Sequence, residues 1–291
     1  MNPIKKVITA ILSFTLLFLF PVFATVAKAG SAKPVSVYTS ILPQRYFVEK
    51  IGGERVDVQV LVSPGKSPAT YEPTPQQVID LGKADVFFSI GVPFEKAFLP
   101  TLKQTLPSLK ITDTTKGIQY RSLVKKNNTK VKDPHVWLSP RLVKIQAKNI
   151  YQSLVDIDPE GKAVYQKGYD QLLKEMNDID RILSDSLASH KGNTMFVFHP
   201  AFGYFADDYG LKQVAIETGG KEPAPAKLQQ IIANAKKDNV SIVFVQPEFS
   251  QNSARAIAQA INGAVVSLSP LNPDYINNLM HIADAVKGSV R

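Results

Sequence analysis

The chain has 291 residues, of which 44% are hydrophobic and 20% charged, and it contains no cysteine. This composition is typical of a globular protein with one large core or two smaller ones, and it excludes disulfides, thiolate zinc sites and lipid attachment through a cysteine. The formal net charge of +9 is spread along the sequence. The one basic cluster, Arg121 to Lys132, is interpreted as a solvated loop, so no nucleic acid is expected as a partner.

The first 29 residues have the pattern of a secretory signal peptide. A basic start, MNPIKK, precedes an apolar run from Val7 to Ala24 and the small-residue cleavage pattern A-x-A at Ala27 and Ala29. The alternative is a membrane anchor, but Pro21 interrupts the apolar run. We therefore expect residues 1–29 to be cleaved, leaving a periplasmic protein without a lipid anchor.

Residues 30–157 alternate between strand-like and helix-like segments. Strands are predicted at VSVYTS, VDVQVLV, DVFFSIG and LKITDTT, and helices at LPQRYFVEKIGG, TPQQVIDLGKA and PFEKAFLPTLKQTL. Strands and helices that alternate in this way form a parallel sheet covered by helices. The segment is therefore predicted to be an N-terminal α/β lobe.

Residues 158–190 have the periodicity of one long helix. Asp158 is a suitable N-cap, and Pro159 suits the first helical position. Apolar residues then recur at threes and fours: Tyr165, Tyr169, Leu172, Met176, Ile179, Leu183 and Leu187. About 30 helical residues would reach roughly 45 Å. We expect a rigid helix that connects two lobes, because the stripe lacks the sustained heptads of a coiled coil.

A second series of strands and helices fills residues 191–291, with strands at MFVFH, LKQVAIE, SIVFVQ and AVVSLS. The predicted fold is α/β, with two lobes, each a mostly parallel sheet covered by helices, joined by one long rigid helix. His199 follows the first of these strands, at the sheet edge where α/β proteins bind ligands. A lone histidine there is structural about as often as functional, and His135 in DPHVWLSP is a candidate second ligand.

Five motifs resemble those of the periplasmic metal-binding (zinc or manganese) proteins of ABC importers: PGKSPATYEPTPQQV, DPHVWLSPRLV, VFHPAFGYFADDYGL, IETGGKEPAPAKL and VFVQPEFS. They stand in the family's order, and the resemblance covers nearly the whole chain after residue 29. The resemblance implies two lobes with a metal ion bound between them, and a permease in the inner membrane as partner. We expect a monomer that is not an enzyme.

The resemblance also implies the metal ligands. Zinc-binding members typically use three histidines, often with a carboxylate, and His135 and His199 match two of the histidines. Ala69 stands where the third is expected, and Ser269 where an Asp of a DPL turn is expected. Tightly bound zinc takes four ligands, so two ligand positions are altered.

Two carboxylates are possible additional ligands, Glu248 in QPEFS and Glu217 at the end of QVAIE. Each is otherwise a solvated or hydrogen-bonded side chain. Two histidines with one carboxylate would also suit manganese or iron. Lys66, close to Ala69, leaves an anion or a metal chelate open as the ligand.

Three functions follow from these residues. The first is the solute-binding component of an ABC importer for a divalent metal, zinc before manganese or iron, with a weakened or altered site. The second is a metal-free relative that acts through protein contacts. The third is a hydrolase that uses His199 with Asp207 or a hydroxyl, although neither a nucleophile elbow nor an HExxH motif is present.

Overall fold

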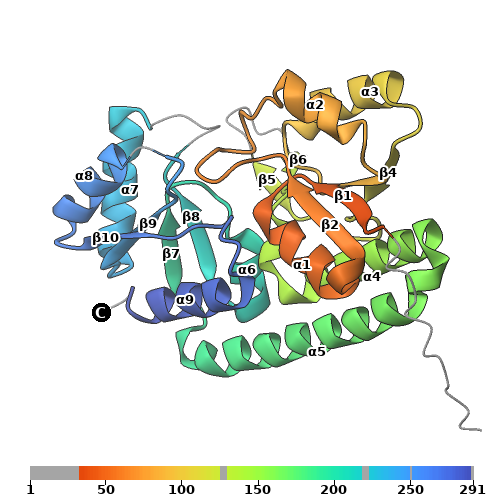
Figure 1. Cartoon of the computed structure of the whole chain (residues 1–291). Coiled ribbons are helices and arrows are strands. Elements are labelled where there is room, and N and C mark those ends of the chain that lie inside the picture. Colours follow the sequence, from red (N-terminus) through yellow and green to blue (C-terminus); the bar gives the residue numbers. More distant parts are fainter. Residues whose placement is uncertain (1–32, 125–129, 218–222, 250, 290–291) are drawn as a thin grey trace, which may run out of the picture. The chain divides into compact units, whose positions relative to one another are not determined.

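The computed structural model describes residues 33–124, 130–217, 223–249 and 251–289 (Figure 1). The expected signal peptide therefore lies outside the described residues. Contacts hold Lys33–Arg291 together as one unit, so the domain boundaries expected at residues 157 and 190 stay predictions. No helix of the described ranges is both long and apolar enough to cross a membrane.

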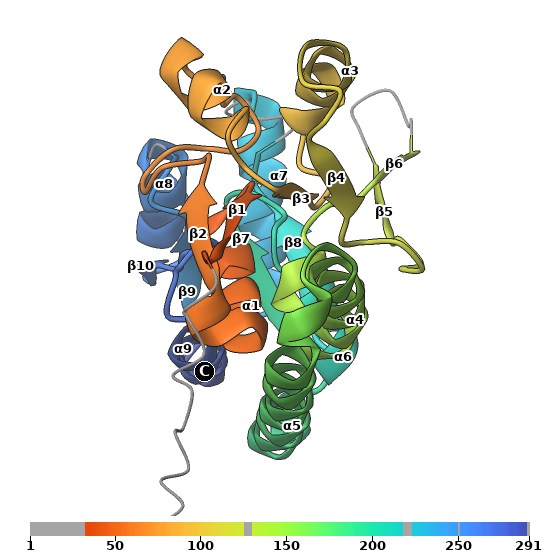
Figure 2. The same ribbon diagram turned by 45° about the vertical axis from the view of Figure 1, so that its right-hand side comes forward.

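The first sheet is parallel, with strand order β2-β1-β3-β4. Its strands are β1 (Val35–Thr39), β2 (Val56–Val60), β3 (Val86–Ser89) and β4 (Lys110–Asp113). Helices α1 (Leu42–Gly52) and α4 (Pro140–Ile157) pack together on one face, with α2 (Pro75–Leu81) and α3 (Glu95–Thr105) on the other (Figures 1 and 2). The central strand β3 is buried along its whole length because helices cover both faces.

The second sheet repeats this topology. Its order is β10-β9-β7-β8, which reads as 2-1-3-4 in chain order from the β8 edge, as in the first sheet. The strands are β7 (Thr194–Val197), β8 (Lys212–Ala215), β9 (Ile242–Val245) and β10 (Ala264–Ser267), and the helices α6 (Gly203–Tyr209), α7 (Pro225–Lys237), α8 (Asn252–Ala260) and α9 (Tyr275–Lys287). The predicted fold class, two lobes with helix-covered parallel sheets and a long helix, is confirmed.

The long helix is α5, Lys162–Ser186, with 25 residues rather than the 30 expected. Asp158 caps a separate 3-10 turn, Pro159–Gly161, and a second such turn, Ala188–His190, follows α5. The break falls at Gly161, where a Cβ would lie 2.4 Å from the Asp158 carboxylate. Helix α5 contacts α1 and α4 of the first lobe and α9 of the second, so it packs against both.

The basic segment Arg121–Lys132 differs from the predicted solvated loop. It contains an antiparallel pair, β5 (Ser122–Val124) and β6 (Lys130–Lys132), in which Leu123 is opposite Val131. Leu123 and Val131 are partly buried, and their cross-strand pairing favours the ladder over a solvated loop. The side chain of Arg121 is also engaged, as described below.

Candidate metal site

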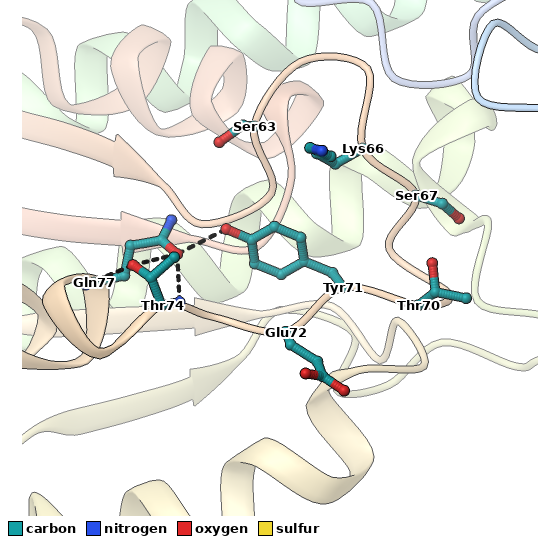
Figure 3. Close-up of a pocket in the computed structure, with 8 residues that line it drawn as sticks. All are labelled: Ser63, Lys66, Ser67, Thr70, Tyr71, Glu72, Thr74 and Gln77. Carbon is teal, nitrogen blue, oxygen red and sulfur yellow. Dashed lines mark hydrogen bonds between the residues drawn. The ribbon is translucent and has the colours of Figure 1, made fainter.

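The loop that carries Ala69 is held in place by the start of α2. Gln77 and Thr74 form a capping box. The backbone N–H of Gln77 donates to Thr74 Oγ1 (3.2 Å), and the backbone N–H of Thr74 donates to Gln77 Oε1 (3.0 Å). The loop surrounds a cavity of about 470 Å³ lined by hydroxyl groups together with Lys66, Glu72 and Gln77 (Figure 3). Ala69 itself is exposed, and its methyl group supplies no metal donor.

His135 lies between β6 and α4, at the start of the short turn Val136–Leu138. Its Nδ1 lies 2.7 Å from Oδ1 of Asp133, and the same oxygen accepts the His135 backbone N–H at 3.0 Å. The ring is almost fully buried, and burial lowers the pKa of His135 although Asp133 acts in the opposite direction. The imidazole is therefore kept in the neutral form, which is the form that binds metals.

His199 lies at the carboxyl end of β7, as expected for a ligand of an open α/β sheet. Its Nδ1 lies 2.9 Å from Oε1 of the buried Glu217. Gln246 fixes the backbone of His199 by accepting its N–H at 3.1 Å and donating to its carbonyl at 2.7 Å. The Phe249 ring stacks on the imidazole with centroids 5.0 Å apart. Glu217 and Phe249 thus hold the ring, and Gln246 holds the backbone of His199.

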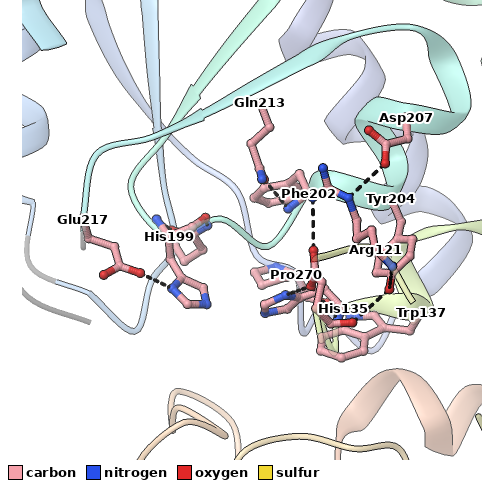
Figure 4. A network of polar contacts seen from close by, with 12 residues as sticks. Arg121, His135, Trp137, His199, Phe202, Tyr204, Asp207, Gln213, Glu217 and Pro270 are labelled. Carbon is pink, nitrogen blue, oxygen red and sulfur yellow. Dashed lines mark hydrogen bonds and ion pairs between the residues drawn. The ribbon is translucent and has the colours of Figure 1, made fainter. Parts of the chain in front are cut away.

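The two histidines lie together although they are 64 positions apart in the chain (Figure 4). Their ring centroids are 5.2 Å apart and the ring planes cross at 73°. Two imidazoles bound to one tetrahedral zinc through bonds of about 2.0 to 2.1 Å would have centroids roughly 5 Å apart. Each Nδ1 faces a carboxylate, so Nε2 is the nitrogen that each ring can offer to a metal.

Further donors are sparse near the pair. Ser269 and Glu248 line one cavity of about 250 Å³, which Ser63, Pro64 and Gly65 of the first lobe also border. The Ser269 hydroxyl accepts the Leu271 amide at 3.1 Å. The pKa of Glu248 lies above its usual value, because burial raises it by more than the nearby His199 lowers it. Across the described residues, no three His, Cys, Asp or Glu side chains are arranged to hold a metal ion.

Several residues that support the site were missed by sequence reasoning. Asp133 stands two residues before His135, so the DPH motif contained the signal for it. The sequence predicts a solvated loop around Arg121, but its Nη1 lies 3.1 Å from Asp133 and its Nε 2.9 Å from Asp207. Asp207 therefore pairs with Arg121. Glu217 contacts His199 as a ring-orienting carboxylate, and its role as a direct ligand stays a prediction.

Residues 37–288 match the family model described as zinc-uptake complex component A, periplasmic. This chain belongs to that family. Its members are metal-binding solute-binding proteins of ABC importers, found in the periplasm or outside the cell, and they are transport components rather than enzymes.

Individual relatives agree with this membership. The high-affinity zinc uptake system protein ZnuA of Bacillus subtilis is 26% identical, with 87% of each chain covered. The zinc-binding lipoprotein AdcA of Streptococcus pneumoniae is 28% identical over 92% of this chain and 55% of its own length.

Solved structures share the fold. A crystal structure of a ZnuA protein has a TM-score of 0.85 at 38% identity, covering 89% of this chain and all of that one. A zinc-bound deletion mutant of ZnuA has a TM-score of 0.84 at 38% identity, covering 89% of this chain and 99% of that one.

Proposed function

We propose that this protein is a periplasmic solute-binding component that carries a divalent metal, zinc first, to the permease of an ABC importer in the inner membrane. It acts as a monomer, and the metal is its cargo. The observation that carries the proposal is the pair His135 and His199, with ring centroids 5.2 Å apart.

The orientation of these rings supports metal binding. Each imidazole has its Nδ1 against a buried carboxylate, Asp133 in one lobe and Glu217 in the other. Metal-binding histidines commonly have this second partner, which fixes the tautomer and makes the other nitrogen a stronger donor. A histidine kept only for packing would not require such a carboxylate, and here both rings have one.

Glu248 is proposed as the third ligand once a metal is bound, although in the described residues it does not form a three-residue metal cluster with the two histidines. It shares a cavity with Ser269, the position where the family's usual carboxylate is expected, and it follows β9 next to Phe249, which stacks on His199. Two imidazoles and one carboxylate would bind zinc more weakly than four protein ligands, and they would admit manganese or iron.

A second candidate function is a metal-free relative that docks to a permease without carrying an ion. Two observations favour it: Ala69 offers no donor, and no cluster of three metal-binding side chains occurs in the part of the chain that the structure describes. Metal content after purification without chelators separates the two functions. The carrier retains zinc or manganese at a substantial fraction of one ion per chain, whereas the metal-free relative retains neither.

Titration calorimetry tests the residues. We expect His135→Ala and His199→Ala each to abolish zinc binding, and Glu248→Gln to weaken it by about tenfold or more. His281→Ala is the matched control, since His281 lies on α9 and is exposed. Zinc uptake that persists undiminished in the double histidine variant would refute the proposed site.

A further inference from the structure

We infer that Arg121 is a positioning residue for metal binding, which sets the separation of His135 and His199 by joining the two segments that carry them. The inference deepens the proposed function and rests on it. Arg121 comes from the first lobe, immediately before β5, and its guanidinium reaches helix α6 of the second lobe.

One end of the guanidinium holds the partner of His135. Nη1 lies 3.1 Å from Oδ2 of Asp133, whose other oxygen, Oδ1, faces Nδ1 of His135. Asp133 is fully buried, so the guanidinium lies against a carboxylate that is shielded from solvent. Arg121 therefore helps to hold in place the acceptor that orients the ring.

The other end holds the helix that follows His199. Nε lies 2.9 Å from Asp207, and the guanidinium carbon lies 5.8 Å from the centre of the Tyr204 ring (Figure 4). The Tyr204 hydroxyl accepts the Arg121 backbone N–H at 3.1 Å and donates to the Asp133 carbonyl at 2.9 Å. Helix α6 is thus fixed to the His135 segment by both side-chain and backbone contacts.

Gly203 provides the space for this contact. A Cβ at Gly203 would lie 1.5 Å from Nη1 of Arg121, a separation that non-bonded atoms cannot adopt. Gly203 stands four residues after His199, so any side chain there would push Arg121 away from α6. The glycine and the arginine form one contact and can be tested from either side.

Arg141 is a matched control for Arg121. It also pairs with two carboxylates, Asp180 on α5 and Asp208 on α6, and its guanidinium carbon lies 5.8 Å from the Tyr209 ring centre. It contacts neither Asp133 nor Glu217. If an arginine that contacts α6 had a purely structural role, variants of Arg121 and Arg141 should therefore show equal effects.

The experiment measures zinc affinity by competition with a chromophoric chelator, and coordination by the visible absorption of bound cobalt(II), for folded full-length variants. We expect Arg121→Gln and Gly203→Ala each to weaken zinc binding by about tenfold or more and to change the cobalt spectrum. Arg141→Gln should match the parent in both. If Arg121→Gln does not fold, Asp207→Asn replaces it, because that carboxylate is 57% exposed and its loss leaves the Asp133 contact in place.

The outcomes are distinguishable. Arg121 and Gly203 variants that bind zinc and cobalt as the Arg141 variant does would overturn this inference and leave the proposed function intact. If His135→Ala or His199→Ala leaves metal binding unchanged, both the proposed function and this inference are refuted.

Discussion

The indole nitrogen of Trp137 donates a 2.7 Å hydrogen bond to the carbonyl of Pro270, and these two residues are 133 positions apart in the chain. The Tyr275 hydroxyl donates in turn to the Trp137 carbonyl at 2.7 Å. The Tyr275 ring packs edge-on against Phe47, with the ring centroids 4.9 Å apart. All four residues are buried. A hydrogen-bonded aromatic cluster therefore joins the turn next to Ser269 with the segment that carries His135.

This cluster and α5 together lead to the prediction that the two lobes do not reorient widely. Opening the lobes would leave the indole N–H and the Pro270 carbonyl without partners, which costs about 1 to 3 kcal/mol for each buried group. Small-angle scattering curves with and without zinc should therefore nearly superpose. A change of several Å in the radius of gyration would contradict this expectation.

Restoring the two altered positions should restore tight zinc binding. Gln77 of the capping box accepts the hydroxyl of Tyr71, two residues after Ala69, and Ser269 lines the same cavity as Glu248. Ala69→His and Ser269→Asp together would supply the missing donors of a tetrahedral site. We expect a gain of at least about a hundredfold in zinc affinity by chelator competition. The single variants are the controls, and a folded double variant that binds no better than the parent would show that these positions do not face the metal.

Glu95 predicts a pH dependence of stability that is separate from metal binding. It is buried at the start of α3, accepts hydrogen bonds from Ser40 and from the Ile90 and Gly91 amides, and lies near Asp113. Burial raises its pKa to about 7. The folded state then holds a proton that the unfolded state releases, so this contribution is complete below about pH 4.5 and is lost as the pH rises through about 7.

The measurement is urea unfolding between about pH 5 and pH 8. We expect the parent to lose roughly 3 kcal/mol of unfolding free energy from this group over the full interval between the two pKa values. Glu95→Gln, which cannot ionise, should flatten this part of the profile. Profiles of equal slope for the parent and Glu95→Gln would show that Glu95 keeps an ordinary pKa.

Gly168 on α5 tests how closely that helix approaches α1. Helix propensity alone predicts that Gly168→Ala stabilises the protein by about 1 kcal/mol. A Cβ there, however, would lie 2.4 Å from the Lys50 carbonyl oxygen and 2.5 Å from that of Ile51. We expect a destabilisation of about 2 kcal/mol, because the helices must separate. The exposed neighbour Lys167→Ala should change the unfolding free energy by less than about 0.5 kcal/mol. Stabilisation by the alanine would show that the contact is looser.

The sheets and the long helix could be predicted because their signals are local. Alternating buried strands and the apolar stripe of α5 are visible within short windows of sequence. The carboxylates that pair with the histidines were harder to predict. Glu217 is 18 positions after His199 and reaches it only because the strands that precede the two residues are neighbours in the sheet. The role of Arg121 is hidden for the same reason: its partners Asp133 and Asp207 come from different lobes, and a run of basic residues alone suggests solvent exposure.

The placement of one imidazole in each lobe has a consequence for unloading. An ion bound by both His135 and His199 would require a fixed separation of the two imidazoles. Metal–nitrogen bonds of about 2 Å allow little variation in that separation. A displacement of about 1 Å between the lobes would leave the ion with the donors of a single side. Under the proposed function, a partner protein would therefore release the ion by a slight shear of the two lobes, with α5 intact.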